Sequence, residues 1–119
     1  MKLSLVVLYV PPPTLDRAAA FYGAVFDAEP VREQHGEKGS EHWSVTCPAT
    51  GLVMELYPAW SRPHTAARLE FRGPDIEDAV QRLIDRAYAL PEKTRDGAGW
   101  WCHDAIGNTV ILLPESTPN

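Results

Sequence analysis

The chain lacks any cluster of basic residues. Its 11 Lys and Arg residues are outnumbered by 16 Asp and Glu residues, which gives a net charge of -5. A protein that binds the nucleic-acid backbone needs a clustered basic surface, so we expect no nucleic-acid partner. No apolar run approaches the ~20 residues that cross a bilayer, and the apolar stretch 3–10 is short for a secretory signal. We therefore expect no membrane partner and a cytoplasmic location.

Cysteine is scarce, and the familiar catalytic motifs are missing. Cys47 and Cys102 are the only two cysteines, too few for a disulfide framework, so we expect free, buried thiols. The sequence contains no Gly-rich phosphate loop, no GxSxG elbow and no CxxC pair. Cys102 and His103 are neighbours on an expected strand, where adjacent side chains point to opposite faces. They therefore cannot pair as nucleophile and base.

What the chain does contain is a repeated pattern. The stretch 100–115 (WWCHDAIGNTVILLPE) holds two apolar runs around Gly107 and Asn108, and this predicts a β-hairpin because Gly and Asn adopt positive φ at low cost. The stretch 43–58 (WSVTCPATGLVMELYP) has the same form. Its Gly51 corresponds to Gly107, which lies 56 positions further along the chain. The sequence therefore predicts the same hairpin twice.

The segments before the two hairpins also follow one order. A strand is expected at 2–10 and another at 66–71, each followed by a helix, with Thr14 and Asp75 as the predicted N-caps. Apolar residues recur at helical spacing after both caps, and weak strands are expected at 27–34 and 89–93. The chain of 119 residues is thus predicted to be one α+β domain, 1–119, with two βαβββ modules at 1–58 and 65–115 and a linker at 59–64.

Two short motifs carry a resemblance to a known family. The segment AAAFY (18–22) follows the first strand, and the turn DAIGN (104–108) closes the second hairpin, with Ala105 where the family usually has proline. Together with the paired modules, they resemble the vicinal oxygen chelate superfamily, which includes glyoxalase I, extradiol dioxygenases, fosfomycin-resistance enzymes and bleomycin-resistance proteins. The resemblance implies a curled, mixed eight-stranded sheet around a concave ligand cleft. It does not imply one chemistry, since the fold hosts many reactions.

The resemblance also indicates where a metal centre would lie. Enzymes of this superfamily hold a divalent ion with His, Gln or Glu ligands, one from the first and last strand of each module. Those places fall on Leu5, Glu55, Arg68 and Ile111, and only Glu55 can ligate a cation. We therefore expect no metal and no cofactor, as in the bleomycin-resistance branch. The convergence of these places implies that Arg68 meets Glu55 where the ion would be.

Strand alternation and the tryptophans define the expected ligand site. If Glu55 points into the cleft, alternate residues of the neighbouring strands do so as well. Four tryptophans offer flat surfaces suited to stacking on planar ligands. The predicted ligand-binding residues are Leu5, Val7, Tyr9, Trp43, Glu55, Tyr57, Trp60, Arg68, Glu70, Trp100, Trp101, His103 and Ile111.

Three functional hypotheses follow. The leading one is a metal-independent binding protein that sequesters a planar aromatic or cationic compound such as an antibiotic, as a resistance protein does. The second is a metal-free isomerase or lyase with Glu55 as general base. The third is a regulatory or partner-binding module with a vestigial cleft. Since one module makes only half of a curled sheet, the resemblance also implies a homodimer, with modules of two chains closing around each pocket.

Overall fold

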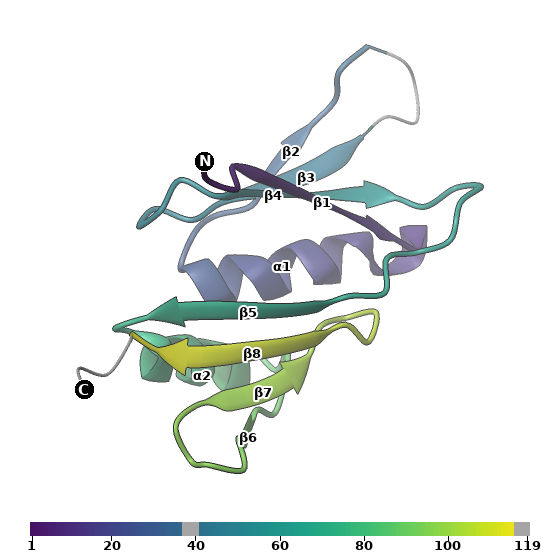
Figure 1. The fold of residues 1–119 in the computed structure, drawn as a ribbon. Helices are drawn as coiled ribbons and strands as arrows, with labels where there is room; N and C mark the ends of the chain where they lie inside the picture. The colour runs from purple at the N-terminus through teal and green to yellow at the C-terminus, as the bar shows by residue number, and fades with distance from the viewer. Residues whose placement is uncertain (37–40, 116–119) are drawn as a thin grey trace.

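The computed structural model describes residues 1–36 and 41–115, and the chain folds as two similar halves (Figure 1). The first half contains β1 (Leu5–Val10), a 3-10 turn (Pro12–Thr14), α1 (Leu15–Phe26), β2 (Val31–Glu33), β3 (His42–Thr46) and β4 (Val53–Pro58). The second contains β5 (Arg68–Gly73), α2 (Ile76–Asp85), β6 (Glu92–Lys93), β7 (Trp100–His103) and β8 (Thr109–Pro114). Each half is therefore a βαβββ module, as predicted.

The strands of each module form one mixed sheet with the same topology. Sheet A has the order β1-β4-β3-β2, and sheet B has the order β5-β8-β7-β6. In both, the first strand pairs in parallel with the last, and the remaining neighbours are antiparallel. The predicted α+β class and the repeated hairpin are confirmed. Within the described residues the strands divide into two four-stranded sheets and do not join as one sheet of eight.

The repeat extends to individual side chains that the sequence did not pair. On the helix side of sheet A, the indole Nε1 of Trp43 donates a hydrogen bond of 2.9 Å to Asp16 in the first turn of α1. Arg32, opposite Trp43 on β2, places its guanidinium 6.0 Å from the indole ring. Sheet B repeats this arrangement, with an indole hydrogen bond of 3.1 Å and a cation 4.4 Å from the ring, through Trp100, Glu77 and Lys93.

The core is shared between the two modules. α1 packs against β3 and β4 of its own module and against α2 of the other, so most of its residues are buried. Phe71 on β5 lies edge-on to Phe26, with ring centroids 5.3 Å apart, and 6.5 Å from the ring of Tyr22. Burial of these aromatic rings across the boundary contributes to joining the halves.

Two arginines form hydrogen bonds to backbone carbonyls across the same boundary, near the ends of the helices. Arg17 of α1 donates to the carbonyl of Ala87 just after α2 (2.7 Å), and Arg82 of α2 donates to the carbonyl of Ala24 near the end of α1 (2.7 Å). The Arg82 contact satisfies a carbonyl that α1 leaves unpaired at its C-terminus. Thr14 and Asp75 do occupy the N-cap positions, but neither side chain makes the predicted capping hydrogen bond. The Thr14 hydroxyl instead donates to the carbonyl of Pro11, because the 3-10 turn brings that oxygen within 2.9 Å.

The DAIGN turn fastens module two to module one. The buried carboxylate of Asp104, in a residue 7% exposed, accepts hydrogen bonds from the backbone N–H groups of Ile106 and Asn108 and from the Asn108 side chain. Its fourth donor is the hydroxyl of Tyr22 on α1, at 2.7 Å. Burial first, and then the nearby Asp104, raises the pKa of the Tyr22 phenol well above its usual value, so this hydroxyl remains a donor. The two motifs that carried the family resemblance thus touch each other.

No helix among the described residues is both long and apolar enough to span a bilayer.

Candidate functional site

The face of sheet A turned away from α1 carries a row of rings. Leu8 and Val10 point into the core, so Tyr9 between them lies on the opposite, open face, and Tyr57 is its register partner on β4. Their ring centroids are 6.3 Å apart. Tyr57 in turn stacks on the imidazole of His42, at 4.1 Å and 10° between planes. His35, just beyond β2, follows at 5.3 Å. We call these four residues the ring row.

Two carboxylates lie beside the ring row. Glu55 Oε2 is 3.0 Å from Nε2 of the buried His42, and Glu33 Oε2 is 3.1 Å from Nε2 of His35. Burial first, and then Glu55 and Glu33, raises the pKa of the Tyr57 phenol, so both acids act on the middle of the row. The open face of sheet A therefore combines flat rings with negative potential.

One end of the ring row already holds a planar cation from the chain itself. The guanidinium of Arg62, in the segment between the sheets, lies 4.3 Å from the centroid of the Tyr9 ring. This is the geometry of a cation–π contact. The face is therefore able to accept a flat, positively charged group.

The open face of sheet B has a different character. Arg68 and Glu70 alternate along β5 and approach each other at 3.4 Å, both largely exposed. Trp101 and His103 on β7 meet edge-to-face, with ring centroids 5.6 Å apart, and Trp101 lies opposite the buried Ile111 on β8. This face offers one indole and mixed charges, without a stacked row.

The expected pair between Glu55 and Arg68 is wrong for the single chain. Arg68 is 67% exposed beside Glu70, while Glu55 contacts His42. The reason is that Glu55 and Arg68 lie on different sheets, whereas β3 brings His42 against β4 on the same face as Glu55. From the sequence, a partner for Glu55 was expected only among the four metal positions of the family. None of those positions lies on β3, so His42 was not considered as its partner.

The predicted site residues lie in separate places: on the two open faces, on the helix sides of both sheets and after β4. Leu5, Val7, Tyr9, Glu55 and Tyr57 occupy the open face of sheet A, and Arg68, Glu70, Trp101, His103 and Ile111 occupy that of sheet B. Trp43 and Trp100 lie on the helix sides of their sheets, bonded to the helix acids, and the largely exposed Trp60 follows β4. Within the described part of the chain, Trp43 lines one pocket and Trp101 and His103 line another.

Four residues of the ring-row region were missed by sequence reasoning: Glu33, His35, His42 and Arg62. A signal for His42 was present, because aligning β3 and β4 outward from Gly51 places it on the same face as Glu55. The two residues Glu33 and His35 are two positions apart and so share one face of an extended segment.

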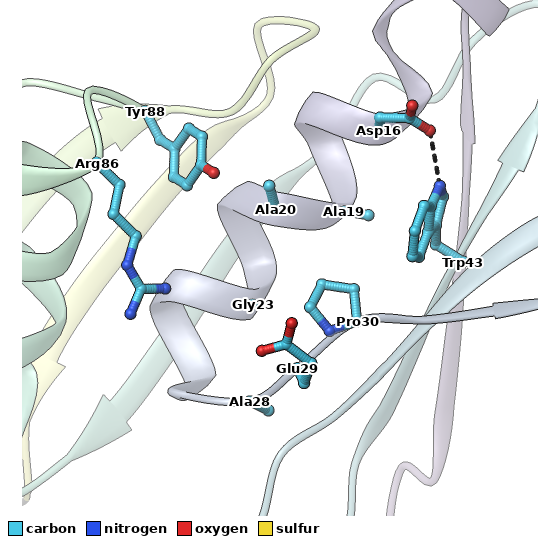
Figure 2. A pocket seen from close by; sticks show the side chains of 10 residues that line it. All are labelled: Asp16, Ala19, Ala20, Gly23, Ala28, Glu29, Pro30, Trp43, Arg86 and Tyr88. Carbon is cyan, nitrogen blue, oxygen red and sulfur yellow. Dashed lines mark hydrogen bonds between the residues drawn. The ribbon is translucent and has the colours of Figure 1, made fainter.

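A pocket of about 410 Å³ lies on the helix side of sheet A, away from the ring row (Figure 2). Its floor is the small-residue face of α1 around Ala20 and Gly23, and its walls include Trp43 and Tyr88. Charged groups at the rim come from Asp16, Glu29 and Arg86. This pocket is the alternative to the ring row as a ligand site. Trp43 lines the pocket and is not part of the ring row, so a substitution of Trp43 tests the pocket alone.

The two cysteines differ in burial: Cys102 is buried as expected, whereas Cys47 is only half-buried. Cys102 is buried, and His103 beside it is exposed, as strand alternation predicted. Burial first, and then Asp104, raises the pKa of the Cys102 thiol to about 11, so it is protonated near neutrality and a poor nucleophile.

Paired βαβββ modules, each a mixed sheet covered by a helix on one side and open on the other, are the fold of the glyoxalase/bleomycin resistance protein/dioxygenase superfamily, and comparison with solved structures shows that this chain has that fold. A superfamily member from Sphaerobacter thermophilus DSM 20745 aligns with a TM-score of 0.68 and 19% identity, covering 97% of this chain and 98% of that one. TnmS3, an antibiotic binding protein from Streptomyces sp. CB03234, aligns with a TM-score of 0.70 and 20% identity, over 98% and 97% of the two chains.

An enzyme shares the fold as well. Lactoylglutathione lyase from Agrobacterium tumefaciens aligns with a TM-score of 0.63 and 19% identity, covering 96% of this chain and 93% of that one. Comparison with protein-family models and with curated proteins gave no match. The fold is thus common to a binding protein and an enzyme, and the choice between these functions rests on the side chains of the site.

Proposed function

We propose that the protein binds a planar aromatic or cationic small molecule, such as an antibiotic, on the open face of sheet A and sequesters it without chemical change. The observation that carries this proposal is the ring row flanked by Glu55 and Glu33, because stacked rings beside carboxylates attract flat cations. Arg62 on Tyr9 supports the same preference. An antibiotic binding protein shares the fold, which agrees with this class of ligand.

The alternative of Glu55 as a general base has less support. That hypothesis requires a carboxylate free to take a proton from a substrate, and Glu55 already contacts the imidazole of His42 at 3.0 Å. The His42 side chain is 1% exposed, so a substrate does not reach the imidazole directly. Of the four family metal positions, Leu5, Arg68 and Ile111 lack ligand groups, so the proposed binding does not use a metal there.

The proposal predicts a specific pattern of binding losses. With proflavine as a flat, cationic fluorescent probe, Tyr9→Ala and Tyr57→Ala should each weaken binding by roughly five- to thirtyfold, the equivalent of about 1–2 kcal/mol for a lost stacking contact. Fluorescence titration measures the change. Trp43→Phe is the matched control: it alters an aromatic residue on the helix side and should leave the affinity unchanged.

Opposite results would contradict the proposal in distinct ways. Weakening by Trp43→Phe, with no effect of Tyr57→Ala, would place the ligand in the helix-side pocket. Chromatography of the probe after prolonged incubation should recover it unchanged, whereas steady conversion that is lost in Glu55→Gln would favour the enzyme hypothesis.

We further propose that two chains form a homodimer that covers the open faces. Among the described residues of one chain, β1 pairs with no strand except β4, and β5 with none except β8, so each sheet ends in an edge strand. Leu3 and Leu5, at the start of β1, are exposed apolar residues beside this edge. Sedimentation at micromolar concentration should show a species of twice the 13.2 kDa chain mass. A monomer under those conditions would refute the dimer.

A further inference from the structure

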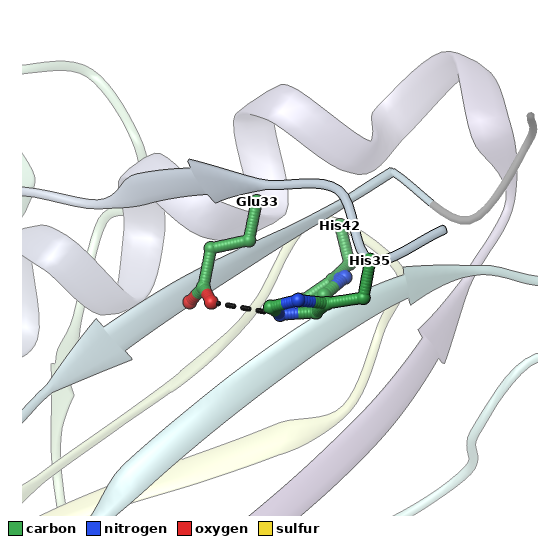
Figure 3. A group of neighbouring side chains, drawn as sticks. All are labelled: Glu33, His35 and His42. Carbon is green, nitrogen blue, oxygen red and sulfur yellow. Dashed lines mark hydrogen bonds and ion pairs between the residues drawn. The ribbon is translucent and has the colours of Figure 1, made fainter. Parts of the chain in front are cut away.

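Three potential metal ligands lie together at the end of the ring row formed by His35 and His42. Glu33 on β2, His35 just after it and His42 on β3 each offer one donor atom, and these atoms lie within 4.8 Å of one another (Figure 3). Glu33 and His42 are register partners across the two strands, so the backbone pairing itself holds two of the donors side by side. His35 points back toward Glu33, with its Nε2 3.1 Å from the carboxylate.

Two imidazoles and one carboxylate are the donor set that proteins use for borderline divalent metals. The same set holds zinc in catalytic sites that keep an open position, and it also suits iron, cobalt and nickel, whereas magnesium and calcium prefer oxygen ligands alone. We infer that Glu33, His35 and His42 form a binding site for a divalent transition-metal ion such as Zn²⁺ at this end of sheet A.

The site is partly built before any ion arrives. The ring of His42 is buried, stacked on Tyr57 and held against the Glu55 carboxylate at 3.0 Å. Metal-binding imidazoles are commonly oriented by such a carboxylate. Ligand atoms around a tetrahedral zinc lie about 3.3 Å apart, so the donors must close in slightly. His35, whose side chain is 70% exposed, has the freedom to make that movement.

This site differs from the metal centre that the family resemblance implied. That centre would take ligands from the first and last strands of both modules, at Leu5, Glu55, Arg68 and Ile111, whereas the donors here are Glu33 on β2, His35 just after it and His42 on β3. The metal site shares Glu33, His35 and His42 with the proposed ligand site, but binding of the ion requires no ligand on Tyr9 or Tyr57.

Metal titration tests the site directly. Tag-free protein treated with EDTA and dialysed should bind one Zn²⁺ per chain by calorimetry, and Co²⁺ should give visible absorption bands of a protein-bound ion. His35→Ala should weaken zinc binding by about tenfold or more. Because the His35 side chain is largely exposed, this variant should fold with an unchanged melting temperature in the absence of metal. Glu33→Gln should also weaken binding.

His103→Ala is the matched control, since His103 is another exposed histidine but lies on sheet B. It should bind zinc as the unmodified protein does. The inference is overturned if the unmodified protein binds no zinc, if His35→Ala binds it with undiminished affinity, or if His103→Ala causes the same loss. The proflavine titration tests Tyr9 and Tyr57, which are not metal ligands, so failure of the metal site and failure of the ligand site are distinguishable.

Discussion

Replacing Asp104 by alanine should lower the free energy of unfolding by about 3–5 kcal/mol, the largest effect we expect from a single polar substitution. The buried carboxylate accepts hydrogen bonds from Tyr22, from the backbone of Ile106 and from both backbone and side chain of Asn108. Alanine would leave those donors buried without acceptors. Urea denaturation followed by tryptophan fluorescence measures the loss as a lower midpoint at an unchanged slope.

Tyr22→Phe is the control for this prediction. It removes one of the four donors and keeps the ring packed against Phe21 and Phe71, so it should cost only about 1.5–3 kcal/mol, the range for one hydrogen bond to a carboxylate. If Asp104→Ala lowered the free energy of unfolding by less than Tyr22→Phe does, the hydrogen bonds of Asp104 would not be what holds the two modules together at this turn.

Gly99→Ala should destabilise the protein by about 3 kcal/mol, although alanine is a minimal change. A Cβ atom at Gly99 would collide with the carbonyl oxygen of Leu112 and lie 2.7 Å from the side chain of Leu113. Leu112 is paired with Trp100 in the β7–β8 hairpin, so its carbonyl cannot retreat without breaking the ladder. Thermal unfolding of the variant measures the loss.

Gly97→Ala, two residues away, separates collision from backbone strain. Gly97 has a φ of +74°, and no atom lies within 4 Å of the place that an alanine methyl group would occupy. Alanine there costs only the strain of the left-handed conformation, about 1 kcal/mol. Equal losses for the two variants would show that the space around Gly99 is not the limiting factor.

The fold could be predicted from the sequence because the same pattern of strands, helix and hairpin occurs in both halves of the chain. Gly51 and Gly107, aligned as the turn residues of two similar hairpins, both have positive φ in the structure, +79° and +92°. With Glu55 expected to face the cleft, strand alternation places its neighbours Met54 and Leu56 on the other face, and both lie in the core. Agreement between turn chemistry and alternation in two copies outweighs the weakness of either signal alone.

The candidate site could be predicted only in part, because which side chains lie next to each other depends on the pairing between strands. Glu55 and Tyr57 were placed on the correct face, but their neighbour His42 required the register of β3 against β4. Trp43 was assigned to the ligand site for its size and flatness. Alternation alone would have placed it with the buried Val45 on the helix side, where it is found.

In the proposed site, a ligand would have to compete with Arg62 for the Tyr9 ring. A ligand that stacks on Tyr9 must first displace a guanidinium tethered 4.3 Å from the ring, so its measured affinity is a difference between two competing occupants. An exposed cation–π contact is worth about 0.5–1 kcal/mol, so this tethered competitor would reduce the apparent affinity roughly two- to fivefold. If the proposed ligand binds on Tyr9, only flat ligands that outcompete Arg62 for the ring would be retained.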